Sequence, residues 1–227
     1  MVGSQEGEIH DMPYEVTRRF ERALCAYTGA PYAVAVNSGT AALTLCVERY
    51  CRHNLGVPPI LRNRIEDEDL YRPQFQIPKH TYVSVPQAII RGGGSVLFTD
   101  TMWKGSYEVG PITRIWDSAC RFTSGMYVAG HFQCVSFAAR KILGAEQGGA
   151  ILHDNADADK WFRKMRFDGR TEGLVADDNI DVIGHHCIMI PSVAATLLLR
   201  LHHLPKHNQD LSGAADYPDI SKHPAFK

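Results

Sequence analysis

Residues 32–42 read Tyr-Ala-Val-Ala-Val-Asn-Ser-Gly-Thr-Ala-Ala, and this stretch sets the pattern from which the fold is predicted. Its first five residues form a short apolar run of the kind that makes a buried strand. Ser38 and Gly39 then turn the chain into a helix expected over residues 40–50, because small residues often precede a helix start. The stretch therefore predicts one strand followed directly by one helix.

The same alternation of apolar runs and amphipathic segments continues along the chain. Further strands are expected at residues 75–77, 95–98, 112–116, 132–135 and 149–152, and further helices at 13–28, 85–90, 156–167 and 191–204. Alternating strands and helices favour a three-layer α/β fold with a mostly parallel sheet that is covered on both faces. Residues 52–73 are polar and rich in proline, arginine and acids, so we expect them to form an excursion from this core.

Length and composition predict one large domain, or one domain with a small appendage. The chain has 227 residues, a net charge of -1 and 44% hydrophobic residues, and a domain of this size buries about 70% of its unfolded surface. We assign residues 1–204 to the core and residues 205–227 to a polar tail, which either packs on a partner subunit or is mobile. A near-neutral charge favours small-molecule partners over nucleic acid or membranes.

The six cysteines and eleven histidines form no motif that indicates a disulfide framework or a metal site. Without a C-x-x-C pair, reduced thiols in a cytosol are the expected state. His203 and His207 have an i, i+4 spacing, but no third ligand stands at a familiar distance from them. The polar start of the chain and the lack of a long apolar run predict a cytoplasmic protein without a signal peptide or membrane span.

Four short segments place small, polar and charged residues at the ends of predicted strands. They are residues 37–42, 116–119, 136–141 and 147–150. Ligands of open α/β sheets bind at the carboxyl ends of strands, so these segments are expected to meet. Together they supply what pyridoxal 5'-phosphate (PLP) needs: an amine for a Schiff base, a carboxylate for the ring nitrogen, and donors for the phosphate.

Each residue in these segments also has an ordinary interpretation. Ser38, Gly39 and Thr40 could bind a phosphate at the positive end of a helix, or could simply cap that helix. Asp117 could keep a pyridine nitrogen protonated, or could be another cap. Lys141 could form the Schiff base, or could lie in solvent as most lysines do.

Three further residues have the same two interpretations. Ser136 could donate to a phosphate, and Arg140 could bind a phosphate or a substrate anion, or be merely exposed. Tyr82 follows the strand predicted at 75–77, where its ring could stack on a flat cofactor or form part of the core.

Six stretches in a fixed order resemble the DegT/DnrJ/StrS family of sugar aminotransferases. They are residues 20–29, 32–43, 77–84, 117–119, 136–141 and 148–150, within a similarity that runs from about residue 13 to residue 204. The resemblance implies a PLP-dependent homodimer of fold type I. Such an enzyme moves an amino group from glutamate or glutamine to a keto sugar, which is usually carried on a nucleotide.

The matching positions imply a role for each candidate residue. Lys141 would be the Schiff-base lysine and Asp117 the partner of the ring nitrogen. A lysine rather than a histidine at this position favours transamination over sugar dehydration. The other matches would bind the cofactor: Ser38, Gly39, Thr40 and Ser136 at its phosphate, Tyr82 over its ring, and His186 at the cofactor of the neighbouring subunit.

The chain also departs from the family pattern. Members are commonly far longer, with a C-terminal small domain that this chain mostly lacks, and about one strand–helix unit is missing before Asp117. Cys120 stands where the family has Gln or His, Gln147 where it has Glu, and His186 where it has Asn. Two alternatives therefore stay open: another PLP enzyme (dehydratase, lyase or racemase), or a non-catalytic binding or regulatory protein on the same scaffold.

Overall fold

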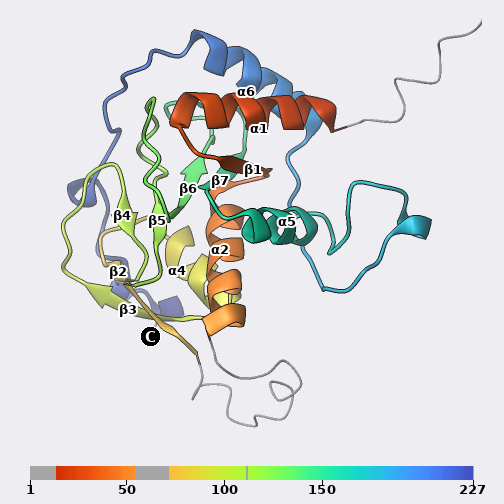
Figure 1. The fold of residues 1–227 in the computed structure, drawn as a ribbon. Coiled ribbons are helices and arrows are strands. Elements are labelled where there is room, and N and C mark those ends of the chain that lie inside the picture. The colour runs from red at the N-terminus through yellow and green to blue at the C-terminus, as the bar shows by residue number, and fades with distance from the viewer. Residues whose placement is uncertain (1–13, 55–71, 111, 227) are drawn as a thin grey trace, which may run out of the picture.

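The computed structural model describes residues 14–54, 72–110 and 112–226, which form a mixed α/β fold (Figure 1). The helices are α1 (Glu15–Thr28), α2 (Gly39–Asn54), α4 (Ser84–Arg91), α5 (Ala156–Met165) and α6 (Pro191–His203). The strands are β1 (Tyr32–Val36), β2 (Gln74–Pro78), β3 (Ser95–Thr99), β4 (Tyr107–Glu108), β5 (Ile115–Asp117), β6 (Phe132–Ser136) and β7 (Gly149–His153). Short 3-10 helices occupy Val175–Asp177, Ala214–Asp216, Ile220–Lys222 and Pro224–Phe226. The expected helix start at residue 13 and most of the polar excursion at 52–73 lie outside the described residues.

Several element ends follow directly from local sequence. Helix α1 ends at Gly29, whose φ of 81° is in the left-handed region, and the Gly29 N–H donates to the Cys25 carbonyl at 2.9 Å. Glycine adopts this conformation without a steric penalty. The side chain of Asn155 caps α5 by accepting from the Ala158 N–H, and α6 begins with Pro191, whose fixed φ suits a first helical position.

A five-stranded sheet lies at the centre, in the order β1-β7-β6-β5-β4. The expectation of a mostly parallel sheet is wrong here, because among its neighbouring strands β5 and β6 are parallel while the other three pairs are antiparallel. The reason is the connections. The chain passes from β4 to β5 and from β6 to β7 without an intervening helix, so each second strand returns antiparallel to the first.

Two strands depart from the sequence expectation in position. The strand predicted at 112–116 is found as β5, which begins only at Ile115, because Arg114 has a φ of 57° and interrupts the extended backbone. Strand β4 was not expected, since two residues carry no readable periodicity. Strands β2 and β3 form a separate parallel pair, joined through α4.

Helices cover both faces of the sheet because side chains alternate along each strand. Val34 and Ile151 join the core beneath α2, and α2 packs on β6 and β7. Ala35 and Leu152 join the core on the opposite face, beneath α1 and α6 (Figure 1). The fold is therefore stabilised by two apolar layers that share one sheet.

The sheet brings several chain segments to one edge. Strands β1, β5 and β6 run in the same direction, so Val36, Asp117 and Ser136 lie at a common end of the sheet. Strand β7 runs the other way and therefore begins at this end, with Gly149 opposite both Val36 and Ser136. The four segments singled out in the sequence thus converge.

After α6 the chain turns back along its own subunit toward β2 and β3, as the blue segment of Figure 1 shows. The Lys206 carbonyl accepts from the Ser124 N–H at 2.8 Å, and the Ile220 N–H donates to the Lys79 carbonyl at 3.0 Å. The described part of the tail, residues 205–226, therefore has a docked path on its own chain. Its packing against a partner subunit stays a prediction.

None of the helices in the described ranges has the length and apolar character that a bilayer crossing requires. Within the same ranges, no group of three or more His, Cys, Asp or Glu side chains is arranged to hold a metal ion.

Candidate active site

A cavity of about 800 Å³ lies where the carboxyl ends of β1, β5 and β6 meet. Seven of the eight residues expected at the cofactor line it: Ser38, Gly39, Thr40, Tyr82, Asp117, Ser136 and Lys141. They come from segments up to about 100 residues apart in sequence. The cavity is therefore the candidate active site.

One end of the cavity is formed by the N-terminus of α2, where backbone N–H groups and the positive end of the helix dipole face outward. Ser38 Oγ accepts from the Ala41 N–H at 3.1 Å, which is the cap interaction, and Thr40 Oγ1 donates to Ser84 Oγ at 3.0 Å. A Cβ at Gly39 would come within 2.9 Å of the Ser136 Cβ. Glycine is therefore required where these two segments approach.

Asp117 is buried beside the cavity, and both of its carboxylate oxygens accept a hydrogen bond. The Ala119 N–H donates to Oδ1 at 2.9 Å, and the Tyr107 hydroxyl donates to Oδ2 at 3.1 Å. Burial raises the pKa of the Asp117 carboxyl, while these two donors and the charge of Lys141 act in the opposite direction. The site thus holds a desolvated carboxylate that a nearby cation would stabilise.

Lys141 follows β6 in a tight turn, in which its N–H donates to the Ala138 carbonyl at 2.8 Å. The side chain is half-buried, and its Nζ donates to Cys120 Sγ at 3.6 Å. The amine therefore faces the cavity wall that carries Cys120, not bulk solvent. Arg140, the neighbouring candidate, also lines the cavity and is exposed.

Tyr82 and His186 differ in their relation to the cavity. Tyr82 lines it and is 60% exposed, so its ring has an open face. His186 does not line this cavity, and its Nδ1 lies 3.0 Å from Asp168 Oδ2 on an exposed surface. The structure does not bring His186 to the site of its own subunit, so its role at a neighbouring site stays a prediction.

Sequence reasoning missed several residues that the structure places around Asp117 and Lys141. Tyr107 contacts Asp117 and Thr81, and Ser212 and Tyr217 of the tail line the cavity beside Cys120. Tyr107 lies on a two-residue strand, and the tail hydroxyls lie in a polar stretch without periodicity. Neither Tyr107 nor the tail hydroxyls carry a sequence signal, because only the folding of the chain brings them to the site.

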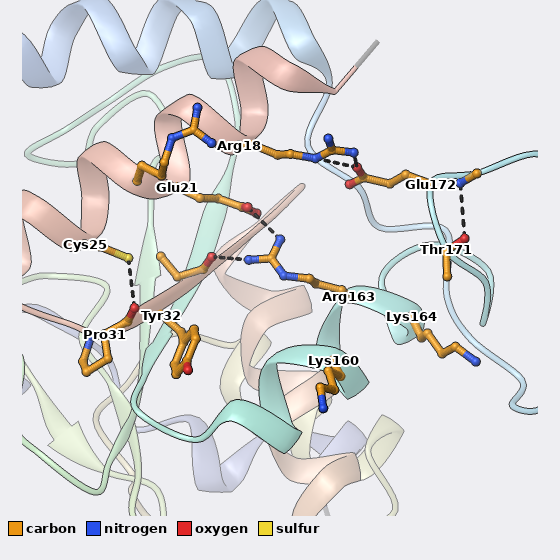
Figure 2. Close-up of a pocket in the computed structure, with 13 residues that line it drawn as sticks. Arg18, Glu21, Cys25, Pro31, Tyr32, Lys160, Arg163, Lys164, Thr171 and Glu172 are labelled. Carbon is orange, nitrogen blue, oxygen red and sulfur yellow. Dashed lines mark hydrogen bonds and ion pairs between the residues drawn. The ribbon is translucent and has the colours of Figure 1, made fainter. Parts of the chain in front are cut away.

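A larger cavity, of about 1040 Å³, lies elsewhere, between α1, β1 and α5 (Figure 2). Its cationic side chains are already paired: Arg163 with Glu21 at 2.7 Å, and Arg18 with Glu172. Glu21 is buried and also pairs with the buried Arg166. We interpret this cavity as the surface of a structural ion-pair network, because none of the expected cofactor residues lines it.

The fold matches several solved structures. AtS13 from Actinomadura melliaura superposes with a TM-score of 0.65 at 19% identity, over 83% of this chain and 59% of that chain. The sugar aminotransferase CalS13 from Micromonospora echinospora gives 0.63 at 15% identity, over 83% and 61%. NtdA from Bacillus subtilis, solved with the cofactor PMP bound, gives 0.61 at 18% identity, over 83% and 48%.

The sequence profile of the DegT/DnrJ/EryC1/StrS aminotransferase family matches residues 4–107 and 125–217, so the chain belongs to this family. This confirms the resemblance drawn from the sequence. The chain spans less than two thirds of the length of the solved structures that it matches. A comparison with curated proteins gave no match.

Proposed function

We propose that this chain is a PLP-dependent aminotransferase that moves an amino group from an amino-acid donor to a keto sugar or a related small carbonyl compound. The observation that carries the proposal is one cavity shared by the Lys141 amine, the buried Asp117 carboxylate and the N-terminus of α2. Two proteins of similar fold support it, since CalS13 is a sugar aminotransferase and NtdA holds PMP.

The residues present fit PLP at each of its functional groups. The N-terminus of α2, with Thr40 and Ser136 nearby, suits a phosphate, and the glycine at position 39 allows Ser136 to lie close to that helix end. The raised pKa of the buried Asp117 carboxyl marks a site that a protonated pyridine nitrogen would complement. The open face of Tyr82 suits contact with a flat ring.

Bound PLP would supply an electrophilic carbon and an electron-withdrawing ring. In this proposal Lys141 would hold the cofactor through its amine, and the same amine, once displaced by the amino donor, would move the proton at the substrate carbon that carries the amino group. Asp117 would hold a proton at the ring nitrogen, and Tyr107 orients the Asp117 carboxylate. Tyr82 limits the access of water to the ring face.

The assignment of Lys141 is tested by covalent trapping. The full chain is incubated with PLP, reduced with borohydride and digested, and we expect the pyridoxyl mass on the Lys141 peptide alone. Lys141→Ala should remove both the label and amino transfer, whereas Lys160→Ala, which changes an exposed lysine, should remove neither. Label on a different lysine in the wild-type chain would contradict the assignment.

The reaction type is tested without an acceptor. PLP-loaded protein given glutamate should release about one 2-oxoglutarate per bound cofactor and then stop, because the amino group stays on the enzyme until an acceptor arrives. Release that continues without an acceptor, or a cofactor-loaded protein that consumes no amino acid, argues for another PLP reaction. A folded protein that shows no cofactor absorbance argues for the binding-protein alternative.

We propose also that the described core corresponds to the large domain of fold-type-I PLP enzymes, short by about one strand–helix unit. The hairpin of β4 and β5 supports this, because it lies between β3 and β6, where the family pattern has a further strand–helix unit. A homodimer in the cytosol is the setting that we predict for the enzyme.

A further inference from the structure

The tail, residues 205–226, reaches the candidate active site and contributes to its wall. Leu211, Ser212 and Tyr217 line the same cavity as Lys141. The Leu211 N–H donates to the Cys120 carbonyl at 3.0 Å, and the Gly105 N–H donates to the Ser212 carbonyl at 2.9 Å. The tail is thus hydrogen-bonded to both sides of the wall that faces the amine.

Three of these wall residues form a closed set of side-chain contacts around one sulfur atom. Ser212 Oγ donates to Cys120 Sγ at 2.9 Å. Tyr217 Oη lies 3.5 Å from that sulfur and 3.3 Å from Ser212 Oγ. We call Cys120, Ser212 and Tyr217 the thiol–hydroxyl ring.

The protons of the ring can be assigned from its donors. Each of the three groups carries one proton, and Ser212 uses its proton toward Cys120. The arrangement that then satisfies all three contacts with one proton each has the Tyr217 hydroxyl donating to Ser212 Oγ and the Cys120 thiol donating to Tyr217 Oη. Every proton is used once, and the S–H points away from Lys141. A sulfur lone pair is therefore left for the Lys141 amine, which donates to it at 3.6 Å.

We infer that Ser212 and Tyr217 are positioning residues for Lys141 and act through the Cys120 sulfur. This rests on the proposed function for the role of Lys141, but the contacts themselves do not depend on a cofactor. Without Ser212 and Tyr217, the Cys120 thiol can rotate and point its S–H at Lys141. The Lys141 amine then loses a fixed acceptor. The tail is thus a component of the active site and sets where the amine points.

The test uses the cofactor-free full chain, so it remains decisive even if PLP binding fails. Lysines are reductively methylated with formaldehyde, and labelling of Lys141 is measured against the exposed Lys160 by peptide mass mapping. We expect Cys120→Ala, Ser212→Ala and Tyr217→Phe each to raise relative Lys141 labelling about 3- to 10-fold, the size of one lost hydrogen bond. Ser212→Thr keeps the hydroxyl and should label like the wild type.

A matched control separates positioning from a loosened tail. Asp210 pairs with Arg121 at 2.7 Å and holds the tail without contacting the ring, so Asp210→Asn should leave Lys141 labelling unchanged. The double variant Cys120→Ala, Tyr217→Phe should label no faster than either single variant, because both changes remove the same interaction. Labelling within about twofold of wild type in the ring variants, or an equal rise in Asp210→Asn, would overturn the inference.

Discussion

Among single residues, Asp117 shows how a functional group lowers the stability of its own fold. Its native pKa is raised by burial, so the folded protein binds this proton more tightly than the unfolded chain does. The free energy of unfolding is then unaffected at pH values below the ordinary carboxyl pKa. It declines as the pH rises from that ordinary pKa to the raised pKa of the folded protein. Above that pH window the buried, ionised carboxylate lowers the free energy of unfolding of the cofactor-free protein by a constant amount.

We therefore predict that Asp117→Asn leaves the cofactor-free protein at least as stable as wild type at pH 7. The amide oxygen can accept from one of the two donors, the Tyr107 hydroxyl or the Ala119 N–H, and the loss of the other hydrogen bond is offset because no buried charge remains. Urea unfolding at pH 4 and pH 7 measures the effect, and amino transfer should meanwhile fall by several orders of magnitude. A variant that is destabilised by more than about 1 kcal/mol at pH 7 would contradict the predicted cost.

Tyr107 gives a second prediction, because its hydroxyl donates to Asp117 Oδ2 and also contacts Thr81. Tyr107→Phe leaves a buried carboxylate with one donor fewer, which costs about 1–3 kcal/mol at pH 7. The lost donor also raises the pKa of Asp117 further, so the decline of stability with pH should extend to higher pH. Tyr127→Phe, which removes a half-buried hydroxyl that donates to the His131 carbonyl at 3.1 Å, is the control. An equal loss in both variants would contradict the assignment.

Between secondary-structure elements, an ion-pair network ties α1, β1 and α5 together. Glu21 on α1 accepts from the Ala35 N–H of β1 at 2.9 Å and pairs with Arg163 of α5 and with Arg166 (Figure 2 shows Glu21 and Arg163). Burial alone would raise the pKa of Glu21, but the charges of Arg166 and Arg163 outweigh it and lower this pKa. The network is therefore strongest when Glu21 is ionised.

Breaking this network should be costly at neutral pH and nearly harmless in acid. Glu21→Gln removes one of the two carboxylates that pair with the buried Arg166, and Glu172 remains at 3.0 Å, so we expect a loss of about 3 kcal/mol at pH 7, the low end for a broken buried pair. Because a lowered pKa stabilises the fold above the ordinary carboxyl pKa, the difference should shrink as the pH falls through the folded value. Urea midpoints from pH 7 to pH 3 test this, with Glu15→Gln, which alters an exposed pair of α1, as the control. A pH-independent difference would show that charge is not the cause.

For the whole molecule, the position of His186 predicts assembly. This side chain is exposed and lies away from its own cavity, although the family resemblance assigns the position to the cofactor of a neighbouring subunit. We predict a homodimer by light scattering at micromolar concentration in PLP-loaded protein. A monomer with full cofactor occupancy would refute it.

Complementation tests whether that dimer shares its sites. A mixture of Lys141→Ala and His186→Ala chains should regain part of the lost activity, because a mixed dimer then contains one site with both native residues. His185→Ala is the control, because it changes a neighbouring histidine that pairs with Glu48. This variant should stay active without a partner chain to complement it. Absence of recovery in verified mixed dimers would confine His186 to its own subunit.

The amino-acid sequence alone determined the helices, most of the strands and the group of segments that meet at the cavity. These features are local: an apolar run makes a strand, and Gly29 ends a helix because its backbone adopts a left-handed conformation. Ser38, Asp117 and Lys141 were found because each follows a strand, and strand ends of an α/β sheet meet at one edge.

Only the tertiary structure decided the direction of β7 and β4, the role of Tyr107 and the return of the tail. A strand's apolar pattern is the same in either direction, so its partners are chosen by connection length and by packing. Ser212 and Tyr217 reach Cys120 across more than 90 positions in sequence, through contacts that only the folded chain can make. The sequence therefore predicts which residues can do the chemistry, whereas long-range packing decides what surrounds and orients them.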